Sequence, residues 1–268
     1  MESTPRPEVA PTSRHRRTIA VTGSGSGIGA AVAGRFERSG VRVIGIDLRG
    51  AQVIADLSKP DGRARAVAEV TELSGSRLDG LVLCAGLGPQ VLPLEMIAAV
   101  NFFGALAILD AMLPLLVEGE ASAAVVVSSN SASLTPAHEE LLGLLLDGDE
   151  DKASACAAGL DGATVYGMSK LALTRAMRRR AGAWGKAGVR LNAVAPGPVD
   201  TPLLAGGLED PVLGPLIEAL PVPLGRRATP SEIAASIGFL LDPANSYIHG
   251  SVLFVDGGSD ALFRPDGL

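Results

Sequence analysis

Tyr166 and Lys170 carry the side chains with the clearest capacity for chemistry in this sequence. They stand four residues apart, a spacing that brings two side chains onto one face of a helix. A tyrosine hydroxyl titrates near pH ~10, but a nearby cation favours the phenolate and lowers its pKa. The pair could therefore move a proton to or from a bound substrate. Exposed pairs on helix surfaces share this spacing, so its meaning depends on the rest of the chain.

A glycine-rich turn at residues 22–29 follows the first strand-like run and opens a helical stretch. Glycines allow a tight turn there and let a pyrophosphate approach the N–H groups at the helix N-terminus. Asp47 ends the second strand-like run about 20 residues further on, the position from which a carboxylate reaches ribose hydroxyls. Strand, turn, helix and carboxylate together predict a dinucleotide-binding site.

The carboxylate of Asp47 also bears on which dinucleotide binds. It would repel a 2′-phosphate, which favours NAD(H) over NADP(H), whereas Arg49 leaves some room for a phosphate. Asp56 and Leu57 follow the third strand-like run and either meet the adenine or belong to an ordinary loop. We expect NAD as the cofactor.

Strand-like apolar runs alternate with helical stretches along almost the whole chain, a pattern typical of a parallel sheet covered by helices. The predicted strands are 18–22, 42–47, 52–55, 78–83, 123–128, 190–194 and 252–255. The predicted helices are 28–39, 60–73, 101–116, 165–187 and 231–241. The predicted fold class is α/β, a single-domain Rossmann fold with a doubly wound, seven-stranded parallel sheet and helices on both faces.

Two segments interrupt this alternation. Residues 134–161 separate a strand from the helix of Tyr166 by far more than an ordinary connection of about 2–6 residues, and are interpreted as an insertion or lid. Residues 203–224 are rich in Pro, Gly and Leu and have no place in the sheet. Both segments could wall an apolar pocket at the carboxyl ends of the strands, where open α/β sheets bind ligands.

Composition narrows the class of protein. Of the 268 residues 47% are hydrophobic and 19% charged, which allows a deep core, and the net charge of -6 offers no electrostatic footprint for nucleic acid. We find no run approaching the ~18 apolar residues of a membrane span. Cys84 and Cys156 are too few for a disulfide framework, which favours reduced thiols and a cytoplasmic location.

The ends and the histidines suggest no further site. Residues 1–17 contain three prolines and a basic cluster and are interpreted as a flexible N-terminal tail preceding the dinucleotide-binding domain at 18–268, with a nucleic-acid-binding arm as the alternative. His138 and His249 lack partners at metal-ligand spacing, so no metal is expected. The arginines between 175 and 180 are interpreted as a solvated or subunit-facing surface.

In combination these motifs resemble the short-chain dehydrogenase/reductase family over residues 18–258. The turn at 22–29 looks like the family's Thr-Gly-x-x-x-Gly-x-Gly, and Tyr166-x-x-x-Lys170 looks like its signature pair. The remaining matches are the helix asparagine Asn101, the strand-end serine Ser129, the nicotinamide segment Pro196, Gly197, Val199 and Thr201, and the C-terminal motif Asp256-Gly257-Gly258. The chain departs from the family at Cys84, where an asparagine is usual.

The resemblance implies the roles of individual residues. Tyr166 would be the general acid or base, Lys170 would lower its pKa and bind the nicotinamide ribose, and Ser129 would orient the substrate oxygen. Asn101 would support a water-linked proton path, or cap the helix that we expect to begin there. The implied cofactor-binding residues are Gly23, Ser26, Gly27, Ile28, Gly29, Asp47, Leu48, Asp56, Leu57, Cys84, Ala85, Gly86, Tyr166, Lys170, Pro196, Gly197, Val199 and Thr201.

Among the subfamilies, the sequence is most similar to bacterial 3α-hydroxysteroid dehydrogenase/carbonyl reductases. The resemblance implies an NAD(H)-dependent oxidoreductase that interconverts a secondary alcohol and a ketone, with a hydroxysteroid or similar apolar carbonyl compound as substrate. An aromatic alcohol, a monoterpenoid alcohol, an acyl-thioester, or a nucleotide-binding sensor without catalysis are the alternatives. A homodimer or homotetramer is expected from the family.

Overall fold

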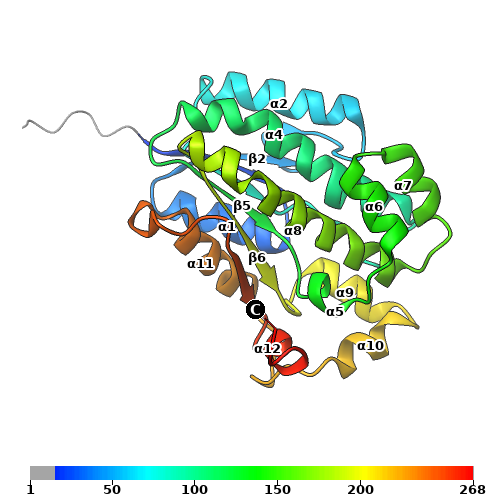
Figure 1. Cartoon of the computed structure of the whole chain (residues 1–268). Coiled ribbons are helices and arrows are strands. Elements are labelled where there is room, and N and C mark those ends of the chain that lie inside the picture. The colour runs from blue at the N-terminus through cyan, green and yellow to red at the C-terminus, as the bar shows by residue number, and fades with distance from the viewer. Residues whose placement is uncertain (1–15, 268) are drawn as a thin grey trace, which may run out of the picture.

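Seven parallel strands form a single sheet at the centre of the molecule (Figure 1). The structure is a computed structural model that describes residues 16–267. The strands lie in the order β3-β2-β1-β4-β5-β6-β7. Their bounds are β1 Thr18–Thr22, β2 Arg42–Asp47, β3 Val53–Ile54, β4 Gly80–Leu83, β5 Ala123–Val127, β6 Arg190–Pro196 and β7 Val252–Val255. The order reverses between β1 and β4, which opens a crevice at their carboxyl ends.

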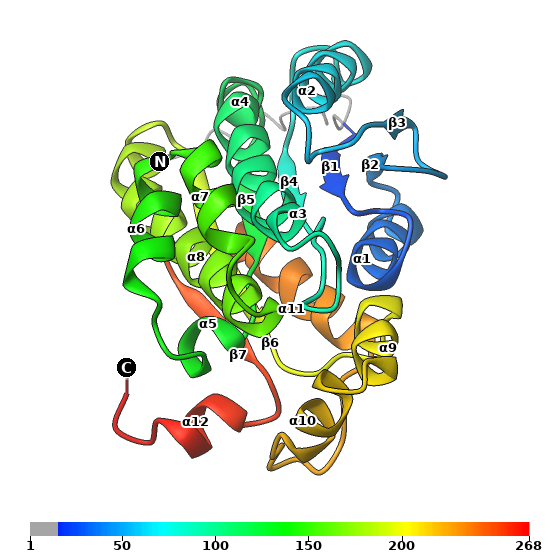
Figure 2. The same ribbon diagram turned by 90° about the vertical axis from the view of Figure 1, so that its right-hand side faces the viewer.

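Helices cover both faces of the sheet (Figures 1 and 2). α1 (Gly27–Arg38) and α11 (Pro230–Leu241) pack together on one face, over the core residues Ile19, Val21 and Val125. α2 (Pro60–Ser74), α4 (Ala105–Val117) and α8 (Gly162–Lys186) pack on the other. Adjacent residues of β1 alternate between these two cores, as the period of a strand requires. The predicted fold class is confirmed.

The helix of Asn101 is longer than the sequence indicated. It runs without a break through α3 (Glu95–Ala98), a π-helical turn η1 (Ala99–Gly104) and α4. Asn101 therefore lies inside the helix, and the interpretation as an N-terminal cap is wrong. The expectation that no run approaches the length of a membrane span is also wrong, because the helix Glu95–Val117 is long and apolar enough. An apolar stretch of 18 residues within it is 56% buried in the fold, as in a core helix.

The two interrupting segments are largely helical. Residues 134–161 contain α6 (Glu139–Asp147) and α7 (Glu150–Ala157), after the short α5 (Ser131–Leu134). α6 packs on α8, and α7 packs on α3 and η1. Residues 203–224 hold most of α9 (Pro202–Glu209) and all of α10 (Leu213–Ala219), which pack on each other. α10 and α12 (Ser259–Phe263) lie at the same end of the molecule, the lower end in Figure 2. A single 3-10 turn, Pro243–Asn245, follows α11.

The remaining boundaries differ from prediction by a few residues. β3 has only two residues, and β4 begins at Gly80. Leu78, which was predicted to be in this strand, bonds instead to the Leu115 carbonyl at the end of α4. α8 begins at Gly162, where the carboxylate of Asp161 accepts a hydrogen bond from Thr164 N–H at 2.9 Å. Residues 1–15 of the predicted N-terminal tail lie outside the described residues. Arg17, the last residue of that tail, donates hydrogen bonds to the Asp79 and Leu241 carbonyls.

Candidate active site

Two adjoining cavities open at the carboxyl ends of the strands. A groove of about 230 Å³ lies over the glycine turn, and a chamber of about 680 Å³ lies beside it. The residues they share include Ile28, Cys84, Gly86 and Thr201. All eighteen of the predicted cofactor residues line the groove or the chamber. One elongated ligand could therefore run from the groove into the chamber.

The glycine turn is shaped for close backbone approach. Gly23 has a φ of +68°, and a Cβ there would lie 2.8 Å from the backbone of Ala85. A Cβ at Gly29 would collide with the Gly23 carbonyl oxygen. Ser26 caps α1 without a side-chain hydrogen bond to it. Within residues 16–267 no side chain caps the N–H groups at this helix end, which suits a phosphate.

Two carboxylates lie along the groove. Asp47 accepts hydrogen bonds from the N–H groups of Gly25 at 2.9 Å and Leu48 at 2.7 Å, which fixes its side chain at the end of β2. Asp56 accepts from the N–H and hydroxyl of Ser58 at 2.9 and 2.7 Å. The Ser58 hydroxyl holds the pKa of Asp56 below its ordinary value, so this carboxylate is charged at neutral pH.

Lys170 reaches from α8 to the end of β5, where its Nζ donates to the Val127 carbonyl at 2.9 Å. Burial lowers its pKa to about 8. Burial also raises the pKa of the Cys84 thiol to about 12. Cys84 is therefore a neutral thiol at neutral pH, and the ammonium of Lys170 is only marginally retained.

Tyr166 and Ser129 both line the chamber, and Ser129 follows the last residue of β5 by two positions. The Ser129 hydroxyl oxygen accepts a hydrogen bond from Ser131 N–H at 3.1 Å. Lys170 Nζ lies 5.9 Å from the centroid of the Tyr166 ring. Burial raises the pKa of Tyr166, and the Ser129 hydroxyl acts in the other direction without reversing the shift. Tyr166 is protonated here and can donate to a carbonyl oxygen.

Asn101 lies behind the walls of both cavities. Its Oδ1 accepts from Leu87 N–H at 2.7 Å, and its Nδ2 donates to the Leu87 carbonyl at 3.0 Å and the Ser169 hydroxyl at 3.3 Å. A Cβ added to Gly86 would lie 3.2 Å from Asn101 Oδ1 and 3.5 Å from Lys170 Nζ. Asn101 therefore fixes the loop after β4, and both Asn101 and Lys170 lie close to Gly86 in that loop.

The segment after β6 closes the junction of the two cavities. Gly197 N–H bonds to the Val255 carbonyl at 3.1 Å, and a Cβ there would lie 2.8 Å from Asp256 Cα. Val199 is buried, and Thr201 caps α9 by accepting from Leu204 N–H at 3.3 Å. Thr201 also faces the glycine turn, because a Cβ on Gly27 would lie 3.2 Å from its methyl group.

Apolar side chains form the outer wall of the chamber. Leu213, Leu216, Ile217 and Leu220 of the α9–α10 segment line it. Of residues 134–161, only Leu134, Thr135 and Pro136 do so, while the body of that segment packs elsewhere. The chamber suits an apolar ligand that presents one polar oxygen to Tyr166 and Ser129.

The sequence missed several residues of the site. Met96 and Val100 line the groove from the long helix, and Gln90 lines the chamber while its Nε2 donates to the Leu203 carbonyl at 3.1 Å. The apolar residues carry no signal that separates them from core positions. Gln90 is a polar residue next to the Gly86–Gly88 turn, and that neighbourhood could have marked it.

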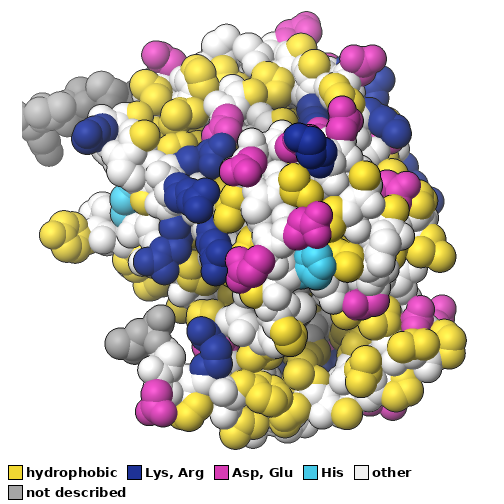
Figure 3. All heavy atoms as spheres, turned by 45° about the vertical axis from the view of Figure 1, so that its right-hand side comes forward, with side chains coloured by type: hydrophobic (Ala, Val, Ile, Leu, Met, Phe, Trp, Pro, Cys, Tyr) yellow, Lys and Arg dark blue, Asp and Glu magenta, His cyan; other side chains and the backbone are white. Residues whose placement is uncertain are grey.

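The residues interpreted as structural have structural contacts. His249 accepts from Leu191 N–H at 3.0 Å and lies 2.7 Å from the Ala181 carbonyl, which joins β6 to α8. His138 caps α6. Arg180 pairs with Asp110 on α4 at 2.6 Å, whereas the other three arginines of this α8 cluster are exposed. Basic side chains gather in a band on the face drawn in Figure 3.

Comparison with known proteins defines the class. A family model described as short chain dehydrogenase matches residues 17–140, and one described as enoyl-(acyl carrier protein) reductase matches residues 153–260. The chain is 49% identical to a 3-alpha-hydroxysteroid dehydrogenase/carbonyl reductase of Comamonas testosteroni, over 92% of this chain and 98% of the relative. The chain belongs to the short-chain dehydrogenase/reductase family and is an oxidoreductase.

Two more relatives bear on the site. The crystal structure of the 3-alpha-hydroxysteroid dehydrogenase from Pseudomonas sp. B-0831 complexed with NADH superposes with a TM-score of 0.91 at 46% identity, covering 94% of this chain and 100% of that one. A coniferyl-alcohol dehydrogenase of a Pseudomonas species is 32% identical over 90% of this chain and 96% of its own length. The resemblance stated from the motifs is confirmed.

Proposed function

We propose that this protein is an NAD(H)-dependent oxidoreductase that interconverts a secondary alcohol and a ketone on a hydroxysteroid or similar apolar carbonyl compound. The observation that carries the proposal is the chamber itself, which Tyr166 and Ser129 line together with a set of leucine and isoleucine side chains. The similarity to two hydroxysteroid dehydrogenases supports the same substrate class.

The groove fits a dinucleotide. The glycine turn leaves no space for side chains at Gly23 and Gly29, and the end of α1 offers N–H groups to a pyrophosphate. Asp47 would accept from the adenosine ribose hydroxyls and disfavour a 2′-phosphate. The remaining predicted cofactor residues would line the path to the nicotinamide. Faster turnover with NADPH than with NADH would contradict the role of Asp47.

The chain's own residues handle the proton. When bound, the nicotinamide supplies or accepts the hydride. In carbonyl reduction, Tyr166 donates its hydroxyl proton to the substrate oxygen, which Ser129 holds by a hydrogen bond. In alcohol oxidation, Tyr166 must take the proton, which requires the positive charges of Lys170 and of oxidised nicotinamide to overcome the effect of burial. Asn101 holds the loop after β4 in place beside Lys170 and supports proton exchange at the Lys170 amine.

The family suggests a cellular location and an oligomeric state for the enzyme. We propose a cytoplasmic homodimer or homotetramer acting on a small-molecule substrate, with 134–161 as an insertion in a single oxidoreductase domain. Reduced Cys84 and Cys156 agree with a reducing compartment. α6 packs on α8, so it occupies part of the surface by which family members commonly associate.

Replacing Tyr166 by Phe tests the mechanism. The variant keeps the ring but loses the transferable proton, so ketone reduction should fall by about 100-fold or more, within the range of general acid catalysis. NADH binding, measured by fluorescence titration, should stay within about twofold of wild type, since the hydroxyl contributes at most one hydrogen bond. Ketone reduction at the wild-type rate would overturn the assignment of Tyr166.

A further inference from the structure

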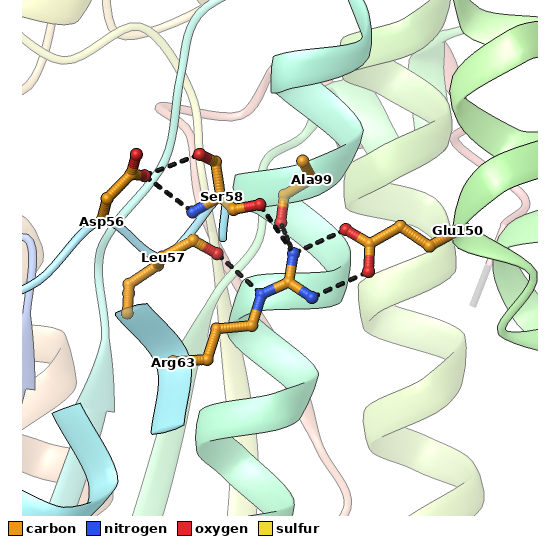
Figure 4. A network of polar contacts seen from close by, with 6 residues as sticks. All are labelled: Asp56, Leu57, Ser58, Arg63, Ala99 and Glu150. Carbon is orange, nitrogen blue, oxygen red and sulfur yellow. Dashed lines mark hydrogen bonds and ion pairs between the residues drawn. The ribbon is translucent and has the colours of Figure 1, made fainter. Parts of the chain in front are cut away.

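Arg63 occupies a buried position next to the groove, with only 8% of its surface exposed (Figure 4). Its Nε donates to the Leu57 carbonyl at 2.8 Å. One terminal nitrogen donates to the Ala99 carbonyl at 3.1 Å and the Ser58 carbonyl at 3.3 Å. Both terminal nitrogens donate to the carboxylate of Glu150, at 2.8 and 2.6 Å. This guanidinium therefore joins three separate parts of the chain.

Two of those parts are walls of the cofactor groove. Asp56 and Leu57 line one side of it, and Val100, next to Ala99, lines the other. The Asp56–Leu57 loop packs closely against α2 and the π-helical turn. A Cβ on Gly62 would collide with the Asp56 carbonyl, and one on Gly104 would lie 2.6 Å from the Leu57 carbonyl. The bonds of Arg63 to the Leu57 and Ala99 carbonyls thus link the two segments that contribute these lining residues.

The third part is the insertion. Glu150 is the first residue of α7, and its side chain is 33% exposed while that of Arg63 is 10% exposed. A guanidinium so far from water is costly unless its charge is balanced. Bidentate pairing with a carboxylate fixes both the charge and the plane of the arginine, which single-point contacts would not do.

We propose that Glu150 of the insertion is a positioning residue for the adenosine half of the cofactor, acting through Arg63 on the Asp56–Leu57 loop and on the π-helical turn. The inference rests on the proposed function, since it takes NAD(H) as the ligand. It assigns residues 134–161 to cofactor binding, because only three residues at their start line the substrate chamber.

The test is the variant Glu150→Gln, which keeps the side-chain shape and removes its charge. Asp151→Asn is the matched control, since Asp151 is the next residue of α7 and is exposed. Binding of NADH and AMP is measured by titration calorimetry. We expect Glu150→Gln to weaken both by roughly 5- to 10-fold, tenfold being about 1.4 kcal/mol, and Asp151→Asn to leave both unchanged.

A second measurement separates positioning from general destabilisation. Reduced nicotinamide mononucleotide lacks the adenosine half, so its rate of turnover should be equal in wild type and Glu150→Gln, as should kcat at saturating NADH. The inference is overturned if Glu150→Gln binds NADH and AMP as tightly as wild type, or if turnover of the mononucleotide falls as much as NADH affinity does. Failure of the wild type to bind NADH would instead overturn the proposed function.

Discussion

At the residue scale, burying the charged amine of Lys170 destabilises the folded protein, and its surroundings compensate only partly. Its Nζ has one carbonyl partner, Val127, and burial lowers its pKa to about 8. An unfolded lysine titrates near pH ~10.4, so the unfolded chain binds more protons between these two values. The fold therefore disfavours the charged amine below pH 8, and this penalty shrinks as the pH rises towards the unfolded value. A charge retained against such a penalty is consistent with a role in catalysis.

The variant Lys170→Met should therefore be more stable than wild type at pH 7 while losing activity. At about 1.4 kcal/mol per pKa unit the relieved penalty is at most ~3 kcal/mol, and loss of the bond to Val127 reduces it to ~1–3 kcal/mol. The gain should disappear near pH 10. Urea unfolding at both pH values measures it, with exposed Lys186→Met on the same helix as the control. A variant less stable than wild type at pH 7 would contradict the burial argument.

At the scale of elements, the α9–α10 segment gives the chamber its apolar character. Ile217 lines the chamber from α10, and Val212 just before α10 is 70% exposed and lies outside it. The variant Ile217→Asn should raise the KM for a hydroxysteroid by about tenfold, since burying such a side chain is worth ~1.5–3 kcal/mol. The KM for a small water-soluble ketone should change little. Val212→Asn is the control, and equal effects of the two variants on the hydroxysteroid would contradict a wall formed by α10.

The strands could be predicted from the sequence, whereas several helices could not. The alternation of apolar runs with helical stretches predicted all seven strands, because buried parallel strands are continuously apolar. The π-helical turn was not predicted, because no local signal near Asn101 marks the wider turn. The Asn101 amide bonds to Leu87, 14 residues earlier in the chain. α6 and α7 were not predicted as helices within the insertion, because short helices that depend on packing against α8 and η1 carry weak periodicity.

At the residue level of the site, the motifs predicted which side chains line the cavities but not their electrostatics. Tyr166, Ser129 and Lys170 follow from spacing and strand ends, since strand carboxyl ends meet along one edge. The raised pKa of Tyr166 depends on desolvation by residues from many elements, which no spacing encodes. Arg63 was missed for a similar reason, because its partner Glu150 is 87 residues away.

For the molecule as a whole, one half of the sheet carries most residues of the groove and the other half carries most residues of the chamber. The half from β1 to β4 presents the glycine turn, Asp47 and the loop that Arg63 holds, while β5 to β7 present Ser129, Tyr166 and the segment after β6. The groove and the chamber meet where the strand order reverses, the usual place for a ligand in an open α/β sheet. One bound dinucleotide would thus bring its reactive ring to the only part of the site where Tyr166 and Ser129 can also reach a substrate oxygen.

The most direct test of this account is the initial rate of NADH formation when the wild-type enzyme is given NAD+ and a 3α-hydroxysteroid. We predict steady formation of NADH, at a kcat/KM at least about tenfold above that for an aromatic or monoterpenoid alcohol, a preference of about 1.4 kcal/mol. Tight binding of NADH without turnover of any of these alcohols would contradict the account and identify a nucleotide-binding protein without this chemistry.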